Sequence, residues 1–286
     1  MKIIVDGNNV CHIVNHSMGQ LSNDERRTGV VFGFMKQMLM LSKRMKTKDF
    51  IFCWDSQKSF RKEIYPEYKS NRKNKEKTEQ EEFERQTLYD QISEIRSKIL
   101  PSLGFKNNFI KTGYEADDLI VYTVLTNPEE DFIIVSTDQD LYQVLNDHAR
   151  IYNTITKKFI TKQDFIEKFG FGPTMFREIK AIAGCTSDYI KGIQGVGEIT
   201  AAKYLRLEKI SSTLIDRIHE GVEIIERNRK LTYLPFQKGE YGTLPNMGIT
   251  LKKDDLKLYN FRKLFNELSF NSFLNDMSEW ERSFGL

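Results

Sequence analysis

The chain has 286 residues, of which 40% are hydrophobic and 29% are charged. A chain of this length and composition can bury one large core or two smaller ones, so general disorder is excluded. Lysine and arginine number 43 and aspartate and glutamate 40, which gives a formal net charge of +3 and excludes a uniformly basic coating protein. The best candidate for a membrane span, 30–41, is interrupted by Lys36 and Gln37, so no membrane association is expected.

The cysteines and the first residues indicate where the chain resides. Cys11, Cys53 and Cys185 are scattered and form neither a disulfide framework nor a paired zinc motif. The opening MKIIVDGNN has too short an apolar run for a signal peptide, and the run ends in an acid. We therefore expect a protein of the reducing cytoplasm.

Short apolar runs alternate with helical patterns along the first half of the chain. Between them, 29–45 is apolar almost all round, as in a helix buried against a sheet, and 81–100 is amphipathic and should stop at Pro101. This alternation predicts an α/β fold with a twisted, mainly parallel sheet flanked by helices. The runs that predict strands are 2–5, 50–54, 108–111, 132–136 and 150–153.

The second half of the chain has a helical pattern. A short helix is expected at 162–170, and after Pro173 no further convincing strand is found. We place a domain boundary there, which divides the chain into 1–173 and a helical region, 174–286. Within 235–248, prolines and glycines mark a loop, and the aromatic-rich end from Leu256 to Trp280 should pack back on the body.

Charge is segregated in one part of the chain. The window 57–77 holds eight basic residues against three acids, and the window 78–90 holds five acids against one base. Two interpretations stay open: a pair of solvated surface helices, or an element that binds phosphates and releases their counterions. In the second, Tyr65 and Tyr68 would add stacking surfaces for unpaired bases.

Three of the predicted strands end in an aspartate. They end at Asp6, Asp55 and Asp138, and Asp140 follows the last of these. Because parallel strands end at the same edge of a sheet, and ligand sites form at that edge, these acids are expected to converge. Any one of them could instead be a turn residue or a helix N-cap, but their joint placement favours a site.

A fourth group of acids opens a helix in GYEADDL. Glu115, Asp117 and Asp118 lie there, and Glu115 and Asp118 share a face. Seven carboxylates would then meet in one pocket, where they would repel and raise each other's pKa unless cations were present. Oxygen ligands without a histidine or cysteine cluster favour Mg²⁺ or Mn²⁺ over zinc.

A glycine turn opens another predicted helix in SDYIKGIQGVGEITAAKYL, 187–205. A dinucleotide-binding turn would need a preceding strand and a third glycine, but Thr200 stands there and the preceding segment is helical. A turn between two helices, at Gly195 and Gly197, instead exposes backbone N–H groups that can hold a phosphate without reading sequence. A plain helical hairpin is the alternative.

These motifs, in this order, resemble the flap endonuclease or 5′-nuclease family, most closely its phage and bacterial 5′-3′ exonuclease branch. The motifs are VDGNN, CWD followed by FRKEIYPEYKSNR, GYEADDL, STDQDL and the glycine-turn segment, and the match runs from Met1 to about Leu205. The resemblance implies a PIN-like nuclease domain, a helical arch at about 57–90 and a helix-hairpin-helix at about 184–205.

The resemblance also implies two metal sites. The first would be surrounded by Asp6, Asp55, Glu115 and Asp117 or Asp118. The second would involve Asp138, Asp140 and Asp188, with Asp117 shared between the two. Both would take Mg²⁺, with Mn²⁺ as a substitute.

Further residues acquire roles from the same resemblance. Lys69 and Arg72 would lie at the base of the arch and steer or polarise the scissile phosphate. The hairpin would grip duplex DNA with the help of K⁺. The expected DNA contacts are Tyr68, Lys180, Gly195, Val196, Gly197 and Lys203.

One residue departs from the family pattern. Phage and bacterial relatives usually have two aspartates before the hairpin, whereas this chain has Cys185 in place of the first and keeps Asp188 as the second. A thiol is a poor ligand for Mg²⁺, so the second site is expected to be weaker and to rely more on water or Mn²⁺.

The expected function is two-metal hydrolysis of phosphodiesters in DNA, and of RNA primers, at a free 5′ end or flap during replication or repair. One alternative is a flap-DNA-binding protein with weakened catalysis because of Cys185. Another is a ribonuclease of the related PIN-like fold, which leaves the hairpin and the basic window without a role. We expect a monomer, in a bacterial or phage-infected cytoplasm, whose replication partners cannot be read from the sequence.

Overall fold

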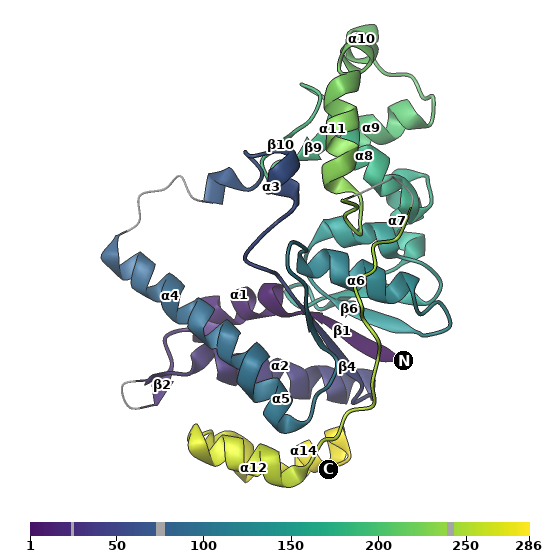
Figure 1. The fold of residues 1–286 in the computed structure, drawn as a ribbon. Helices are drawn as coiled ribbons and strands as arrows, with labels where there is room; N and C mark the ends of the chain where they lie inside the picture. The colour runs from purple at the N-terminus through teal and green to yellow at the C-terminus, as the bar shows by residue number, and fades with distance from the viewer. Residues whose placement is uncertain (24–25, 73–77, 239–242) are drawn as a thin grey trace.

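The computed structural model describes residues 1–23, 26–72, 78–238 and 243–286. Within these residues a six-stranded sheet has the order β5-β4-β1-β6-β7-β8 (Figure 1). All neighbours are parallel except β7 and β8, which form an antiparallel hairpin. The strands are β1 (Lys2–Asp6), β4 (Phe50–Trp54), β5 (Asn108–Ile110), β6 (Phe132–Val135), β7 (Ala149–Asn153) and β8 (Lys158–Ile160).

The five predicted strands and the predicted fold class are confirmed. Strands β4 and β6 are buried along their whole length, and β1 is nearly so, because helices cover both faces of the sheet. Strand β8 and two short hairpins were not predicted. The hairpins pair β2 (Ser22–Asn23) with β3 (Arg26–Arg27), and β9 (Gly184–Cys185) with β10 (Ile190–Lys191). The expectation of no strand after Pro173 is therefore wrong, because two-residue strands leave no apolar run in the sequence.

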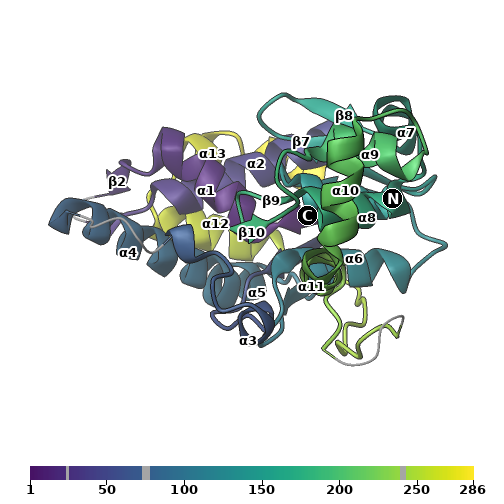
Figure 2. The same ribbon diagram turned by 90° about the horizontal axis from the view of Figure 1, so that it is seen from above.

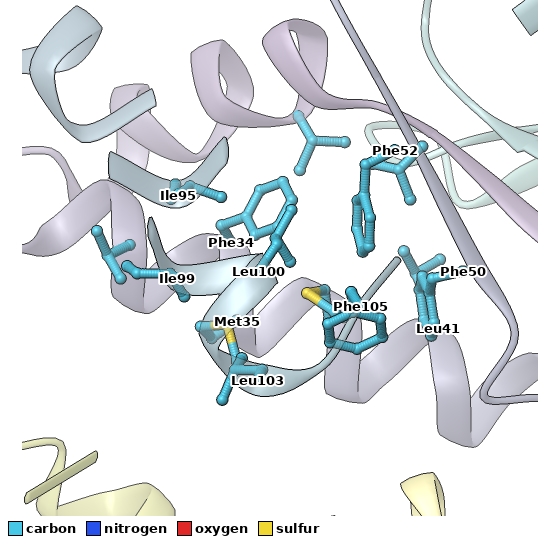
Figure 3. Packing of buried hydrophobic residues seen from close by; sticks show 14 of the residues in the cluster. Phe34, Met35, Leu41, Phe50, Phe52, Ile95, Ile99, Leu100, Leu103 and Phe105 are labelled. Carbon is cyan, nitrogen blue, oxygen red and sulfur yellow. The ribbon is translucent and has the colours of Figure 1, made fainter. Parts of the chain in front are cut away.

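One face of the sheet is covered by the helices nearest the N-terminus together with those at the C-terminus. Phe34 of α2 packs beside Phe52 of β4, and Phe105 lies edge-on to Phe52, with 5.4 Å between ring centroids (Figure 3). Trp280 and Phe284 are fully buried in the same cluster, so the aromatic-rich end packs against this face. The helices here are α1 (Gly7–Met18), α2 (Gly29–Met45), α4 (Glu79–Glu94), α5 (Leu100–Leu103), α12 (Leu258–Glu267), α13 (Asn271–Asn275) and α14 (Met277–Phe284).

The other face carries a second hydrophobic cluster. It joins β-strand residues such as Ile4 and Ile134 to Ile179 and Ala201 from beyond residue 173. The proposed boundary at that residue therefore does not separate two cores, and the division into two domains stays a prediction. The helices around this cluster are α6 (Ala116–Leu125), α7 (Lys162–Phe169), α8 (Phe176–Ala183), α9 (Glu198–Leu205), α10 (Ser212–Glu220) and α11 (Val222–Thr232), as seen from above in Figure 2.

The long helix after the basic window differs from its prediction at both ends. It begins at Glu79 behind a capping box formed by Thr78 and Glu81. It then passes through a π-helical turn, η2 (Ile95–Ile99), and continues as α5 beyond Pro101. Pro101 has no N–H to donate, and the carbonyl of Arg96 in the π-helical turn accepts instead from the side chain of Asn108 at 2.6 Å. The helix ends at Gly104, whose φ of 100° favours glycine and which lies against the backbone of Asp255.

None of the helices in the described part of the chain is long and apolar enough to cross a membrane. All three cysteines are free and buried, as expected from their scatter.

Candidate metal centre and nucleic-acid interface

Asp6 ends the central strand and begins helix α1. Its carboxylate accepts hydrogen bonds from the backbone N–H of Asn9, at 3.0 Å, and from the hydroxyl of Ser136, at 2.9 Å. It therefore serves as the N-cap that the sequence left open as an alternative, while it also points at the carboxyl edge of the sheet. Burial, with repulsion from Asp55, raises the pKa of Asp6 to about 7.

The two asparagines that follow in VDGNN tie neighbouring strand ends together. Asn8 accepts from the backbone N–H of Asp55 at 3.0 Å. Asn9 donates to the hydroxyl of Thr137 at 2.8 Å and accepts from its backbone N–H at 3.2 Å. The sequence analysis gave these amides no role, although two consecutive amides, separated by one glycine from a strand-end acid, were a usable signal. They fix the spacing between the ends of β1, β4 and β6.

The acids at the start of α6 separate into two environments. Asp117 is half-buried and faces the strand-end acids, and burial together with Asp138 and Asp6 raises its pKa well above the usual range. Asp55 approaches from β4 and accepts from the backbone N–H of Ala116 at 2.8 Å. The strand-end group and the helix start therefore meet, as predicted.

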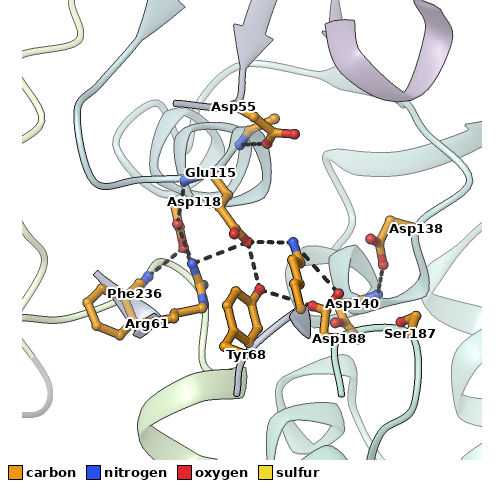
Figure 4. Close-up of polar contacts among 12 residues, drawn as sticks. Asp55, Arg61, Tyr68, Glu115, Asp118, Asp138, Asp140, Ser187, Asp188 and Phe236 are labelled. Atoms are coloured by element: carbon orange, nitrogen blue, oxygen red, sulfur yellow. Dashed lines mark hydrogen bonds and ion pairs between the residues drawn. The ribbon is translucent and has the colours of Figure 1, made fainter. Parts of the chain in front are cut away.

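Asp118, in contrast, is not available to a metal. It is fully buried and receives two hydrogen bonds from the guanidinium of Arg61, at 2.7 and 2.8 Å. It also accepts from the backbone N–H groups of Phe236 and Glu115 (Figure 4). These donors use both oxygens, so the expectation that Asp118 could be a metal ligand is corrected. Arg61, which the sequence placed in a basic surface window, is buried as its partner.

Glu115 connects the helix start to the base of the basic segment. Its carboxylate accepts from the hydroxyl of Tyr68 at 2.8 Å and from Lys69 Nζ at 2.9 Å. Burial alone would raise its pKa, but Arg61 and Lys69 outweigh burial and lower it to about 2. Glu115 is therefore ionised throughout the physiological range.

Tyr68 cannot act as a stacking surface. Its side chain is 2% exposed, and its hydroxyl oxygen lies 3.0 Å from a carboxylate oxygen of Asp188, which shares the single O–H with Glu115. Tyr65 is buried as well. The proposed base-stacking role of both tyrosines is therefore wrong, because both rings are buried and the hydroxyl of Tyr68 supports Glu115 and Asp188.

Lys69 lies between the two halves of the acidic cluster. Besides its contact with Glu115, its Nζ lies 3.7 Å from a carboxylate oxygen of Asp188, and its backbone N–H donates to the carbonyl of Asp188 at 2.8 Å. Its φ of 55° is left-handed, which is uncommon for lysine. Arg72 lies in the short turn η1 (Ser70–Arg72), but its side chain is outside the described part of the structure, as are residues 73–77 of the expected arch.

The second group of acids gathers beyond Asp138. The residue Asp138 is exposed overall, but its carboxyl group is surrounded by protein. This burial, together with repulsion from Asp140, raises its pKa to about 6. Ligand atoms of Asp140, Cys185 and Asp188 lie within 4.8 Å of one another. Cys185 is 5% exposed and its Sγ lies 3.0 Å from the hydroxyl of Ser187. The unusual cysteine thus faces the same space as the acids.

Lys180 is part of this group and not a surface contact. It is 6% exposed and pairs with Asp140 at 3.0 Å and with Glu198 at 3.3 Å. Burial lowers its pKa and the neighbouring carboxylates raise it, with the balance well above the usual range. The expectation that Lys180 contacts a DNA phosphate stays a prediction, to which the structure adds these two carboxylate partners.

The glycine turn borders a cavity that Asp138 and Asp140 also line. Gly195 has a φ of 82°, and Gly197 precedes α9, with open space where a side chain would stand. Val196 is 4% exposed, so only its backbone can face a ligand, while Lys203 is exposed. A cavity of about 540 Å³ runs from Asp138 and Asp140 past Cys185 to Gly197 and Glu198. It connects the acids to the predicted phosphate-binding turn.

A second cavity, of about 410 Å³, lies on the other side of Lys69, under α4. Asp55 and Glu115 line its floor, and Arg85, Tyr89 and Arg96 line its wall. Tyr89 is 42% exposed, in contrast to Tyr65 and Tyr68. The sequence signal for this wall is the helical spacing of 85, 89, 92 and 96.

The donor set fits hard divalent cations. The carboxylates of the cluster outnumber the lysines that pair with them, and repulsion among them contributes to the raised pKa of Asp6, Asp117 and Asp138. Apart from Cys185, the grouped ligand atoms are oxygens, which suit Mg²⁺ and Mn²⁺.

The sheet, the acids at its carboxyl edge and the helices above them define the class of this chain as a PIN-like α/β nuclease fold. Residues 1–170 match the model of the N-terminal, resolvase-like domain of 5′-3′ exonucleases. The chain belongs to the 5′-3′ exonuclease family, which makes it a 5′ nuclease, an enzyme that hydrolyses phosphodiester bonds.

Relatives and a solved structure support this assignment. A 5′-3′ exonuclease of Buchnera aphidicola is 31% identical over 88% of this chain and 89% of its own length. A DNA polymerase I of Pseudomonas aeruginosa is 26% identical over 96% of this chain, which spans only 31% of that polymerase. The bacteriophage T5 D15 flap endonuclease, solved with DNA and metal ions, has the same fold, with a TM-score of 0.69, 24% identity and coverage of 81% of this chain and 88% of that one.

Proposed function

We propose that this chain is a structure-specific 5′ nuclease that acts on DNA as a 5′-3′ exonuclease and as a 5′-flap endonuclease. The observation that carries the proposal is the convergence of carboxylates from β1, β4, α6, the end of β6 and the β9–β10 loop between two cavities. Few folds gather so many acids without a cationic ligand.

Two groups of residues would hold divalent cations. Asp6, Asp55, Glu115 and Asp117 would hold the first, and Asp138, Asp140 and Asp188 the second. Asp118 is not included among these metal ligands, because Arg61 donates hydrogen bonds to both of its carboxylate oxygens. When bound, the two cations would supply a hydroxide nucleophile and stabilise charge on the leaving oxygen.

The chain's own side chains orient the substrate. Lys69 pairs with Glu115 and Asp188 and is close enough to both groups to contact a phosphate that lies between them. Arg72 follows three residues later and would assist it. The backbone of Gly195, Val196 and Gly197, with Lys203 nearby, would hold the duplex, and K⁺ at this turn is part of the proposal.

The single strand would lie in the cavity under α4. Arg85 and Arg96 offer positive charge to its backbone, and Tyr89 offers a ring to a base. RNA–DNA primer duplexes are included as substrates, since the contacts above involve phosphates and not base edges. We further propose that the chain acts as a monomer in replication and repair, in the cytoplasm. The bacterial relatives and the three free cysteines support the cytoplasmic location.

A weakened nuclease that mainly binds flaps is the second candidate, because the thiol of Cys185 faces the second cation group. It predicts tight, salt-sensitive flap binding with turnover no better than that of Asp6→Ala.

The test is cleavage of end-labelled flap, nicked and RNA-primed duplexes in Mg²⁺ and in Mn²⁺, with the wild type, Cys185→Asp and Asp6→Ala. The nuclease proposal expects cleavage by the wild type, higher Mg²⁺ activity in Cys185→Asp and none in Asp6→Ala. Equal turnover of the wild type and Asp6→Ala would favour the binding candidate. Preference for single-stranded RNA over flap DNA in competition would favour a PIN-like ribonuclease.

A further inference from the structure

Lys180 is the central member of a row of three charged side chains. Its ammonium group lies 3.0 Å from Oδ1 of Asp140 and 3.3 Å from Oε1 of Glu198. Only 7% of its side chain is exposed, against 16% for Asp140 and 28% for Glu198. A lysine buried this far must be paired, and here it is paired twice.

The two partners of Lys180 belong to different parts of the site. Asp140 is in the second cation group, and its other oxygen, Oδ2, lies 3.8 Å from Sγ of Cys185. Glu198 is the first residue of α9, directly after the glycine turn. Both line the cavity of about 540 Å³. Lys180 can therefore shift its ion pair from Asp140 to Glu198 while its ammonium group stays buried.

An ammonium group beside Asp140 opposes a divalent cation on the same carboxylate. Like charges this close repel strongly where little water screens them, and the ammonium uses an oxygen that the cation could otherwise use. Cys185 sharpens the conflict in this chain, because a carboxylate at that position would have offset part of the repulsion and a thiol does not.

We propose that Lys180 is an internal competitor of the second divalent cation, and that Glu198 is the alternative partner that releases Asp140 to the cation. Lys180 is thus a positioning residue that lowers the affinity of the second subsite, and Glu198 restores part of it. The inference rests on the proposed function, because the cation bound by Asp140 and Asp188 is the second metal of the nuclease.

The experiment is calorimetric titration of the DNA-free full chain with Mn²⁺. The wild type is compared with Lys180→Met, which removes the charge but keeps the length, and with Lys180→Arg, which keeps the charge. Asp188→Asn, which weakens the second subsite, identifies the binding event that belongs to it. Thermal unfolding followed by circular dichroism verifies that each variant is folded.

Lys180→Met should tighten the second binding event on the order of tenfold, within the usual range of coupling between sites. Lys180→Arg should bind as the wild type does, and Glu198→Gln should bind several-fold more weakly. The double variant, Lys180→Met with Glu198→Gln, should bind Mn²⁺ as tightly as Lys180→Met, because Glu198 acts only through the lysine.

Unchanged or weaker Mn²⁺ binding in Lys180→Met overturns the inference and leaves the nuclease proposal intact. If Lys180→Met does not fold, tighter or unchanged binding in Glu198→Gln overturns it instead. Absence of Mn²⁺ binding in both the wild type and Asp188→Asn contradicts the proposed function itself.

Discussion

Two neighbouring groups of acids in this chain have opposite electrostatic surroundings. Asp6, Asp55 and Asp117 face one another, and burial with mutual repulsion raises the pKa of Asp6 and Asp117. Glu115 and Asp118 face cationic side chains, and the pKa of Glu115 falls to about 2. An external cation would relieve the repulsion among Asp6, Asp55 and Asp117, whereas Lys69 and Arg61 already offset the charges of Glu115 and Asp118. Adjacent residues, Asp117 and Asp118, therefore lie in opposite electrostatic surroundings.

The largest expected effect comes from neutralising one of the mutually repelling acids, Asp6, Asp55 and Asp117. Asp117→Asn should lower single-turnover flap cleavage by about three orders of magnitude, the scale for loss of a principal electrostatic contact in a transition state. Its stability without metal should stay equal or rise, because one member of a repelling set becomes neutral. Rapid-quench kinetics and urea unfolding measure the two quantities. A large loss of stability in Asp117→Asn would contradict the division between the groups.

The next largest effect comes from breaking the buried ion pair between Asp118 and Arg61. Asp118→Asn should cost about 3–5 kcal/mol of unfolding free energy, since it leaves the guanidinium of Arg61 buried without its carboxylate. Urea unfolding checks this value. Arg61→Gln, the matched change on the other partner, should cost a similar amount. A stable Asp118→Asn with lost Mg²⁺ binding would return Asp118 to the metal ligands.

The two groups should also respond to pH in opposite directions. The pKa of Asp6 is about 7 in the folded chain, above its unfolded value, so without metal stability falls as the pH rises from about 4 to 7. The pKa of Glu115 is about 2, below its unfolded value, so its contribution is lost as the pH falls from about 4.5 to 2. Unfolding across this range, with Asp6→Asn and Glu115→Gln, separates the two. A flat wild-type profile between pH 4 and 7 would contradict the first half.

The smallest expected effect concerns the wall of the cavity under α4. Tyr89→Ala should weaken binding of a single-stranded flap by about 1–3 kcal/mol, the usual value for one stacked base. Phe83→Ala is the matched control, because Phe83 is exposed on the same helix but does not line this cavity. Fluorescence anisotropy with a labelled flap measures both. An equal loss in the two variants would remove the specific role of Tyr89.

Much of the fold was predictable because buried parallel strands leave continuous apolar runs, such as IFCW before Asp55. The convergence of strand-end acids followed from that topology. The short strands β9 and β10 were not predictable, since two residues carry no pattern.

The roles of single side chains were harder to predict, because they depend on partners distant in sequence. Asp117 and Asp118 cannot be told apart without Arg61, which lies 57 residues before Asp118. Lys180 was assigned to DNA by the family resemblance and Tyr68 by its ring, and neither signal reveals that the two side chains are buried beside Asp140 and Glu115 respectively. Cys185 was noticed from sequence, and the structure adds that its sulfur faces Asp140 and Asp188.

One measurement tests the central claim most directly: single-turnover cleavage of a 5′-labelled flap duplex in Mg²⁺ by the wild type and by Asp138→Ala. We predict release of short labelled fragments by the wild type and loss of cleavage in the variant, with flap binding and thermal stability retained. An uncut flap with the wild type, or equal cleavage by Asp138→Ala, would contradict the account.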